Sequence, residues 1–270
     1  MLAFANILPA SAGIKEDVAF LSDPMLKGRG FATQGAVAAS WYISGRFASL
    51  GLETSFMSYS TGSGVGHNVI GIHREKPSAK SYVLVMAHYD GIGTYDGTLY
   101  PGADSNASGT AVLLALAEAL SGTEGNFIFA AVDGYSHGHA GARTLAAAGY
   151  KISMVVNLDT IGSVLSPPNK YRPDYLIALG GKPYQKAMDK ANIGPRVRLY
   201  YNYYSSAAFT DYFYRKASDQ APFLEKGITS VMFTSGITMN TNKPSDTPET
   251  LDYEVMGRRC ELILNWLRTL

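Results

Sequence analysis

The sequence predicts an α/β protein with a mostly parallel, mixed central sheet and helices on both of its faces. Short runs of β-forming apolar residues alternate along the chain with longer segments of helical periodicity. The short runs are continuously apolar, which is typical of strands covered on both sides. No repeat, low-complexity tract or linker divides the 270 residues, so we expect a single domain over residues 1–270.

The expected strands are apolar runs of five to seven residues, which is too short for most helices. They are Tyr82–His88, Asn126–Val132, Ser153–Asp159, Tyr175–Leu179, Val197–Tyr201 and Thr229–Thr234. Parallel strands separated by helices end at one edge of their sheet, and ligands of α/β proteins bind outside that edge. We therefore expect the functional site in the loops after residues 87, 132, 158 and 235.

Helical periodicity appears first between Gln34 and Leu50, and Gly51 follows its end. The residues expected on its apolar side are Val37, Trp41, Phe47 and Leu50. A second helix is expected before Gly122, with Ser108 as its N-cap. Its inward residues are Val112, Leu113, Leu116, Ala117 and Leu120. A third helix follows the turn at residues 134–138 and runs to about residue 148.

The last expected helix covers Tyr253–Leu270. The residues that its periodicity directs inward are Val255, Leu262, Ile263, Trp266 and Leu267. Cys260 lies on the same helix and is the single cysteine of the chain, so a disulfide framework and a thiolate metal cluster are excluded. We expect its thiol to be buried as a small apolar group.

Composition excludes several classes of protein. A hydrophobic fraction of 46% excludes a disordered chain, and a net charge of +1 without a basic run argues against nucleic acid as a partner. No apolar run approaches the roughly 18 residues of a membrane span. The apolar first 13 residues include Ala3-Phe4-Ala5, which is similar to the end of an export signal. This similarity favours a periplasmic or extracellular location. The alternative is a cytoplasmic location.

Polar residues stand where two of the expected strands end. His88 closes one strand and is followed two residues later by Asp90, while Asp159 closes another. A histidine with a carboxylate beside it suits a metal ligand whose ring is held in one orientation. A histidine at a strand end is also often a hydrogen-bonded structural residue, so these residues alone do not decide between the two roles.

These residues belong to a longer series of motifs that resembles the zinc-dependent aminopeptidases of metallopeptidase family twenty-eight. That family includes bacterial leucyl aminopeptidases, with glutaminyl cyclases and the transferrin receptor ectodomain as relatives. The matching stretches are Leu26–Gly30, Ser49–Leu52, Asn68–Gly71, Ala87–Asp90, Gly102–Gly109, Val156–Gly162, Ser218–Asp219 and Pro244–Asp252. Their number and order extend the resemblance over nearly the whole chain, and they imply the phosphorylase/hydrolase-like fold of that family.

The resemblance implies a site for two zinc ions, with two His, two carboxylates and one bridging carboxylate as ligands and a Glu as general base. His88 matches the first His ligand, Asp159 matches a carboxylate of the same zinc, and Asp90 matches the residue that orients His88. The other three ligand positions carry different residues, namely Ser105, Ser136 and Asn242. Tyr135 stands at the position of the general base.

Two of five ligands are too few for a stable zinc site, because catalytic zinc usually has three protein ligands. A tyrosine is also a poor base near neutral pH, since its phenol has a pKa near ~10. We therefore expect no bound cofactor, with zinc only at low occupancy if a neighbouring His137 or His139 rebuilds the site. Both histidines could instead lie at the exposed start of the next helix.

Two classes of function remain open. The first is a non-catalytic relative that binds a peptide, a small molecule or a protein partner in the old active-site cleft, whose candidate residues are Tyr203, Tyr204 and Asp219. The second is a metallo-hydrolase or exopeptidase with a rebuilt or mononuclear zinc site. The stretch Gly134–Gly138 also matches the nucleophile elbow of serine hydrolases, but no histidine follows residue 139 to activate Ser136.

Overall fold

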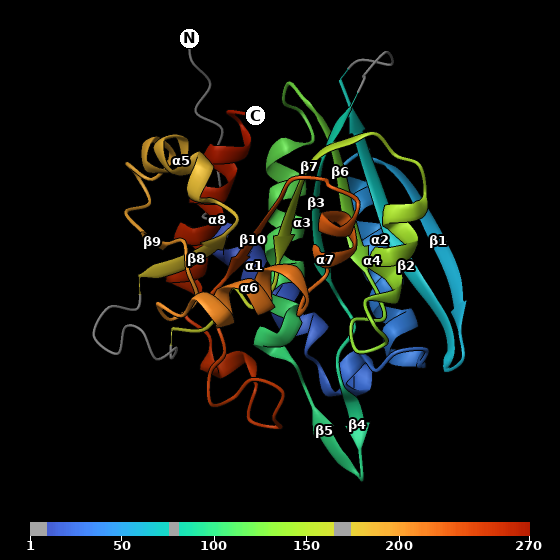
Figure 1. The fold of residues 1–270 in the computed structure, drawn as a ribbon. Helices are drawn as coiled ribbons and strands as arrows, with labels where there is room; N and C mark the ends of the chain where they lie inside the picture. Colours follow the sequence, from blue (N-terminus) through green and yellow to red (C-terminus); the bar gives the residue numbers. More distant parts are fainter. Residues whose placement is uncertain (1–9, 76–80, 165–173) are drawn as a thin grey trace.

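The computed structural model describes residues 10–75, 81–164 and 174–270. In this part of the chain, eight strands form one sheet in the order β1-β2-β6-β3-β7-β10-β8-β9, and β4 and β5 form a separate hairpin (Figure 1). The strands of the large sheet are β1 Glu53–Thr61, β2 Gly64–Arg74, β3 Tyr82–His88, β6 Asn126–Val132, β7 Ile152–Leu158, β8 Tyr175–Leu179, β9 Arg198–Tyr200 and β10 Ser230–Thr234. The hairpin pairs β4 Gly93–Tyr95 with β5 Thr98–Tyr100.

The sheet is mixed, and its centre is parallel. Strand β3 pairs in parallel with both β6 and β7, and β7 pairs in parallel with β10. β8 and β9 are also parallel, whereas β1 with β2, β2 with β6 and β8 with β10 are antiparallel. The four central strands β6, β3, β7 and β10 therefore end at the same edge, where ligands bind in open α/β sheets.

Helices cover both faces of the sheet (Figure 1). The α-helices are α1 Ala10–Leu21, α2 Gln34–Ser49, α3 Gly109–Leu120, α4 Ala140–Ala147, α5 Gln185–Ala191, α6 Ala207–Arg215, α7 Ala221–Glu225 and α8 Tyr253–Leu267. Shorter helical turns are η1 Pro24–Arg29, η2 Ala103–Ser108, η4 Lys182–Tyr184 and η5 Pro248–Thr250. Helices α1, α2, α3, α5 and α8 pack on one face, and α4 and α7 pack on the other.

The alternation of side chains along the strands separates the core into layers. In β3, Val85 and Ala87 face the layer of α1, α2, α3 and α8, whereas Leu84 and Met86 face α4 and α7. Successive side chains of a strand point to opposite faces, and both sets are fully buried here. This double burial explains why the strands read as continuous apolar runs in the sequence.

Most of the expected elements are confirmed. Strands Tyr82–His88, Asn126–Val132 and Tyr175–Leu179 have the expected bounds, and the other three expected strands differ by one residue at one or both ends. All five inward residues predicted for α8 are buried, and so is Cys260. The antiparallel pair β1 and β2 was not predicted as strands, and it extends the sheet at one side. No helix in the described ranges is long and apolar enough to cross a membrane.

The predicted apolar side of α2 was partly wrong. Trp41 is 64% exposed and Val37 is 38% exposed, while Phe47 is buried as expected. The inward side of α2 carries the small residues Ala36 and Ala39, which let the helix lie close to the sheet. Trp41 instead packs edge-on against the ring of Phe56 in β1, with 4.8 Å between ring centroids.

The predicted cap of α3 was only partly right, because Ser108 stands at the N-cap position without making the side-chain cap. Its hydroxyl donates to the backbone and side-chain oxygens of Asp104, at 2.8 and 3.0 Å. The same hydroxyl accepts a hydrogen bond from the amide of Ile161, at 2.9 Å. Ser108 therefore ties the start of α3 to the loop after β7 rather than capping the first turn of the helix.

Candidate functional site

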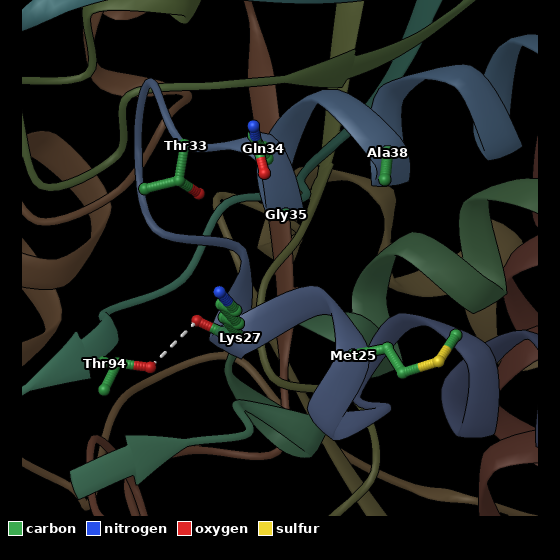
Figure 2. Close-up of a pocket in the computed structure, with 7 residues that line it drawn as sticks. All are labelled: Met25, Lys27, Thr33, Gln34, Gly35, Ala38 and Thr94. Atoms are coloured by element: carbon green, nitrogen blue, oxygen red, sulfur yellow. Dashed lines mark hydrogen bonds between the residues drawn. The ribbon is translucent and has the colours of Figure 1, made fainter. Parts of the chain in front are cut away.

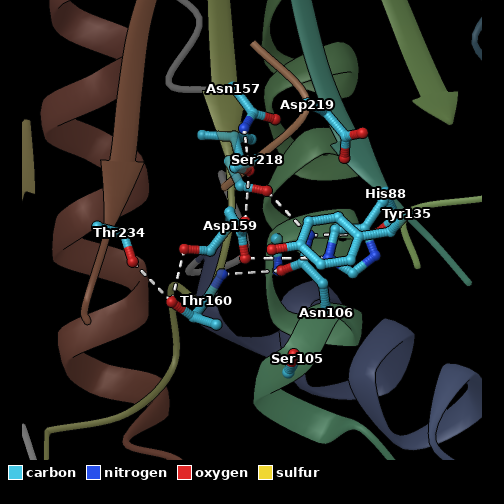
Figure 3. A network of polar contacts seen from close by, with 12 residues as sticks. His88, Ser105, Asn106, Tyr135, Asn157, Asp159, Thr160, Ser218, Asp219 and Thr234 are labelled. Carbon is cyan, nitrogen blue, oxygen red and sulfur yellow. Dashed lines mark hydrogen bonds and ion pairs between the residues drawn. The ribbon is translucent and has the colours of Figure 1, made fainter. Parts of the chain in front are cut away.

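His88 ends β3 at the carboxyl edge of the sheet, where its side chain is almost fully buried. Its Nδ1 lies 3.0 Å from the backbone oxygen of Asp90 and 3.5 Å from the carboxylate of the same residue. Its Nε2 points towards Asp159 at the end of β7, with 3.9 Å to Oδ1, and has no hydrogen-bond partner among the described residues (Figure 3). The sheet thus brings together the two residues that the sequence placed at its edge.

Two carboxylates control the charge of the His88 ring. Burial is the largest influence and opposes protonation, but Asp159 and Asp90 together outweigh it and raise the pKa of His88 to about 10. The imidazole is therefore protonated at neutral pH in this arrangement. It forms a buried ion pair with Asp159 through space, since 3.9 Å exceeds hydrogen-bond distance.

Asp159 is held by residues from a different part of the chain. The hydroxyl of Ser218 donates to Asp159 Oδ2 at 2.5 Å, and Asn157 Nδ2 donates to the same hydroxyl at 2.8 Å (Figure 3). Asn157 Nδ2 also reaches Gln220 Oε1 at 2.7 Å. This chain of hydrogen bonds fixes one oxygen of Asp159 and leaves the other facing His88.

Asn106 joins the ends of the two strands that carry His88 and Asp159. Its Nδ2 donates to the backbone oxygens of His88 and Leu158, at 3.2 and 2.9 Å. Its Oδ1 accepts from the amides of Gly109 and Thr160, at 3.1 and 3.0 Å. One buried amide side chain therefore sets the spacing between β3, β7 and the start of α3.

Tyr135 lies directly over His88. The two rings are stacked, with 4.1 Å between centroids and an interplanar angle of 23° (Figure 3). The Tyr135 hydroxyl donates to the backbone oxygen of Ala217 at 2.6 Å. Burial, together with the carboxylates of Asp159 and Asp219, raises the pKa of this phenol well above its ordinary value of 10.0. Tyr135 is thus a protonated side chain whose only proton is already donated to the backbone.

The loop after β6 directs its two histidines to different places. His139 precedes α4 and its Nδ1 lies 3.1 Å from Oδ1 of the fully buried Asp219. His139 also packs edge-on against Tyr135, with 4.9 Å between ring centroids. His137 is exposed and its ring centroid lies 4.2 Å from that of Phe31, and the preceding residue Ser136 is exposed as well. Of the two histidines, His139 therefore contacts Tyr135, whereas the ring of His137 packs on Phe31.

The remaining positions of the implied zinc site lie on the loops before α3 and after β10. Ser105 Oγ donates to Asn242 Oδ1 at 3.4 Å, so these two residues face each other. The loop of Ser105 is anchored by Asp246, whose carboxylate accepts from the amides of Asp104 and Ser105 at 2.8 and 3.0 Å. Asp104 faces away from this pair, since its Oδ1 accepts from the amide of Gly162 at 2.7 Å.

The donor set does not fit a two-zinc site. The described residues contain no group of three or more His, Cys, Asp or Glu side chains placed to hold a metal ion. Ser105 and Asn242 offer only neutral oxygens, which are weak ligands for zinc compared with carboxylate and imidazole.

The aromatic residues expected near the cleft pack around the loop after β10. Tyr203 is buried, and its hydroxyl accepts from the amide of Ile237 at 2.7 Å. Tyr204 donates from its hydroxyl to the backbone oxygen of Ile237 at 2.9 Å, and Phe213 of α6 stacks on Tyr203. These tyrosines therefore hold the loop that carries Asn242, and Tyr204 is half exposed.

A separate surface cavity of about 470 Å³ lies where α2 begins, beside η1 and β4 (Figure 2). Its lining residues are Met25, Lys27, Thr33, Gln34, Gly35, Ala38 and Thr94. This set contains one charged side chain and neither His88 nor Asp159, so the cavity is not part of the site at the sheet edge.

Comparison with known proteins bears on the family and on the fold of the chain. Residues 68–267 match the family described as Peptidase family M28, which is well over half of the chain. The chain belongs to peptidase family M28. A zinc aminopeptidase from Bacillus subtilis has the same fold at a TM-score of 0.80 and 14% identity, with 98% of this chain and 96% of that one covered.

Two further solved structures share the fold. LapB from Legionella pneumophila matches at a TM-score of 0.80 and 18% identity, with coverage of 97% of this chain and 72% of LapB. A glutaminyl cyclase from Porphyromonas gingivalis matches at a TM-score of 0.74 and 18% identity, with 97% of each chain covered. At these identities the likeness establishes the fold of the M28 chain and not its chemistry.

Sequence reasoning overlooked two contacts of this M28 site. One is the role of Ser218, which appeared only as part of a motif and which binds Asp159. The other is the pair of His139 and Asp219, which are 80 residues apart. The family motif at residues 218–219 was the available signal, since a motif that recurs beside a site usually contacts it.

Proposed function

We propose that this M28 chain is a non-catalytic member of its family that binds a peptide or a similar small ligand at the carboxyl edge of the sheet. One observation carries the proposal, namely the Tyr135 ring stacked on His88 at the position where the family pattern has its general base. A protonated phenol bound to the oxygen of Ala217 cannot take a proton from water at neutral pH. Hydrolysis of a peptide bond needs a group that accepts a proton from the attacking water, and Tyr135 does not supply one.

The polar atoms left without partners support ligand binding at this edge. His88 Nε2 and Asp219 Oδ2 are buried and have no hydrogen-bond partner among the described residues. Buried polar atoms without partners are costly, and a ligand that supplies a partner is favoured for that reason. Three carboxylates, from Asp90, Asp159 and Asp219, surround two histidines, so the charge balance favours a ligand with a cationic group.

Metal content and turnover together test the non-catalytic part of the proposal. We expect protein purified without chelator to contain no stoichiometric zinc, and aminoacyl and peptide substrates to show no turnover above a blank. Turnover abolished by a chelator would contradict the proposal and favour a metallo-hydrolase. Turnover that resists the chelator but stops in Ser136→Ala would instead identify a serine hydrolase.

Ligand binding is tested with a panel of short peptides that differ in their N-terminal residue and in their terminal charge. We expect at least one peptide with a free amino terminus to raise the melting temperature, and Asp219→Asn to weaken that effect because it removes a buried negative charge. The matched control is Asp211→Asn on α6, an exposed carboxylate that pairs with Arg215. Equal binding by both variants would contradict a role for Asp219.

A hydrolase with a rebuilt site remains the second candidate. It is favoured by the His139–Asp219 pair, because His139 packs against the same Tyr135 ring that stacks on His88. If Tyr135 moved aside, His139 would be the nearest additional imidazole. This candidate requires stoichiometric metal in the purified protein and loss of that metal in His139→Ala, whereas His137→Ala should have no effect.

A further inference from the structure

The two outer edges of the eight-stranded sheet differ strongly. Strand β9 forms one edge with only three residues, Arg198–Tyr200, and its arginine is exposed. Strand β1 forms the other edge with nine residues, Glu53–Thr61, and within the described residues it pairs only with β2. Short or charged edges resist pairing with other chains, while long uncharged edges favour it. The β9 edge is therefore protected and the β1 edge is open.

The composition and regularity of β1 make it suited to pairing. Its sequence ETSFMSYST contains no proline and no lysine, and its one charged residue, Glu53, lies 3.4 Å from Arg74 of β2. The pairing with β2 runs from Glu53 to Thr61 without a register shift, so no bulge twists the edge away. Thr, Phe and Tyr are residues that favour strands.

The hairpin loop determines which backbone groups are free. Thr61 and Gly64 pair across the two-residue turn Gly62-Ser63. In such a hairpin the closing residues exchange hydrogen bonds with each other, and every second residue of the strand does the same. The backbone groups of Thr54, Phe56, Ser58 and Ser60 therefore point away from β2. These are the donors and acceptors that a further strand would use.

An exposed apolar surface lies beside this edge. Trp41, which is 64% exposed, and Val37 stand one turn apart on α2, and Trp41 contacts Phe56 of β1. Solvent-exposed tryptophan is uncommon, and tryptophan is enriched at the centres of protein interfaces. The open backbone edge and the apolar side chains thus form one continuous feature, which we call the β1 edge.

We propose that the β1 edge is a self-association surface, on which β1 of a second copy of this chain pairs antiparallel around a twofold axis near Met57. Full overlap places Phe56 opposite Ser58 and Glu53 opposite Thr61 of the second copy. The one charged residue of β1, Glu53, then lies opposite a neutral residue, so no like charges repel each other when two copies pair. Twofold pairing of identical surfaces is also the commonest form of self-association.

Sedimentation equilibrium of the wild type over a concentration range tests the proposal. We expect the mass to rise with concentration from 29.0 kDa towards twice that value. The variant Ser55→Lys/Ser60→Lys places two charges on exposed positions of the edge and should stay monomeric. The control Ala207→Lys/Ala208→Lys adds the same charge on exposed positions of α6 and should dimerise as the wild type does.

A cysteine at the axis tests the register directly. In a non-hydrogen-bonded antiparallel pair the Cα atoms are about 4.5 Å apart, which lies within the roughly 4.4–6.8 Å that a disulfide spans. Met57→Cys should therefore form a disulfide-linked dimer on mild oxidation. Arg198→Cys on the protected β9 edge should not, and the native Cys260 is buried.

Circular dichroism confirms in each case that the variants are folded. A wild type that stays monomeric at its highest soluble concentration overturns the proposal. A dimer that persists in Ser55→Lys/Ser60→Lys, with Met57→Cys no more crosslinked than Arg198→Cys, also overturns it, because self-association would then use another surface.

Discussion

Restoring the ligand positions of the M28 pattern should restore zinc binding to this chain. The required changes are Ser105→Asp, Ser136→Glu and Asn242→His, combined with Tyr135→Glu. The last change returns the general base and removes the ring that stacks on His88. Ser105 and Asn242 already face each other at 3.4 Å, so their replacements start from adjacent positions. Each ligand change alone leaves an incomplete set, so zinc uptake should need all three together.

The magnitude follows from the contacts of Tyr135. Its hydrogen bond to Ala217 is worth about 1 kcal/mol, and its stacking on His88 about 0.5–1.5 kcal/mol. The metal-free variant should therefore lose roughly 2 kcal/mol of its free energy of unfolding, and repulsion among the added carboxylates should lower it further. Zinc at 100 times its dissociation constant adds about 2.7 kcal/mol. The melting temperature should then rise by about 5–10 °C on addition of zinc.

Titration calorimetry with zinc, followed by thermal melts with and without the metal, measures both effects. The control is the same variant with His88→Ala, which should lose most of the zinc affinity because it removes a native ligand position. Uptake of no more zinc than the parent chain takes up would refute the positional matches on which the reasoning rests.

Three further predictions concern buried groups. Arg29→Met should lower the free energy of unfolding by about 3–5 kcal/mol in urea melts, because four backbone oxygens lose a buried donor. Burial, aided by the charge of Asp246, raises the pKa of Asp104 from 3.8 to about 7. The wild type should therefore lose stability as pH rises between these values, since the unfolded chain ionises there first, and Asp104→Asn should flatten that profile in thermal melts. Burial also raises the pKa of the Cys260 thiol to about 12, so iodoacetamide should label it only after unfolding, and rapid labelling of the native protein would contradict this.

The sequence predicted the central strands well because their apolar runs are buried on both faces. It was less informative at the sheet's outer side. Strand β1 carries serine and threonine at most positions and is only partly buried, so no apolar run marked it. The inward side of α2 was misjudged because the helix packs through alanines, whereas the larger Trp41 lies outside. Side-chain size predicts burial poorly where close approach of the backbone decides the packing.

At the site, the rule that parallel strands end at one edge was enough to expect His88 near Asp159. The position of the Tyr135 ring could not be predicted in the same way. It depends on the path of the loop after β6, in which His139 adopts a left-handed backbone conformation with φ of 57°. The pairing of His139 with Asp219 depends on the same path. Local sequence carries little information about such a loop, because contacts with distant segments select its conformation.

The hydrogen bonds by which Asn106 joins the ends of β3 and β7 have a consequence for which residues of this chain can be exchanged. The Asn106 amide fixes the ends of β3 and β7 by hydrogen bonds to the backbone of His88, Leu158 and Thr160. The framework of the site therefore does not depend on an ion to hold it together. Residues at ligand positions such as Ser105 and Asn242 can then be exchanged for other neutral residues at little cost in stability. The residues that hold the strand ends together and the residues at the ligand positions are thus different ones, so this architecture allows the site to vary while the shape is kept.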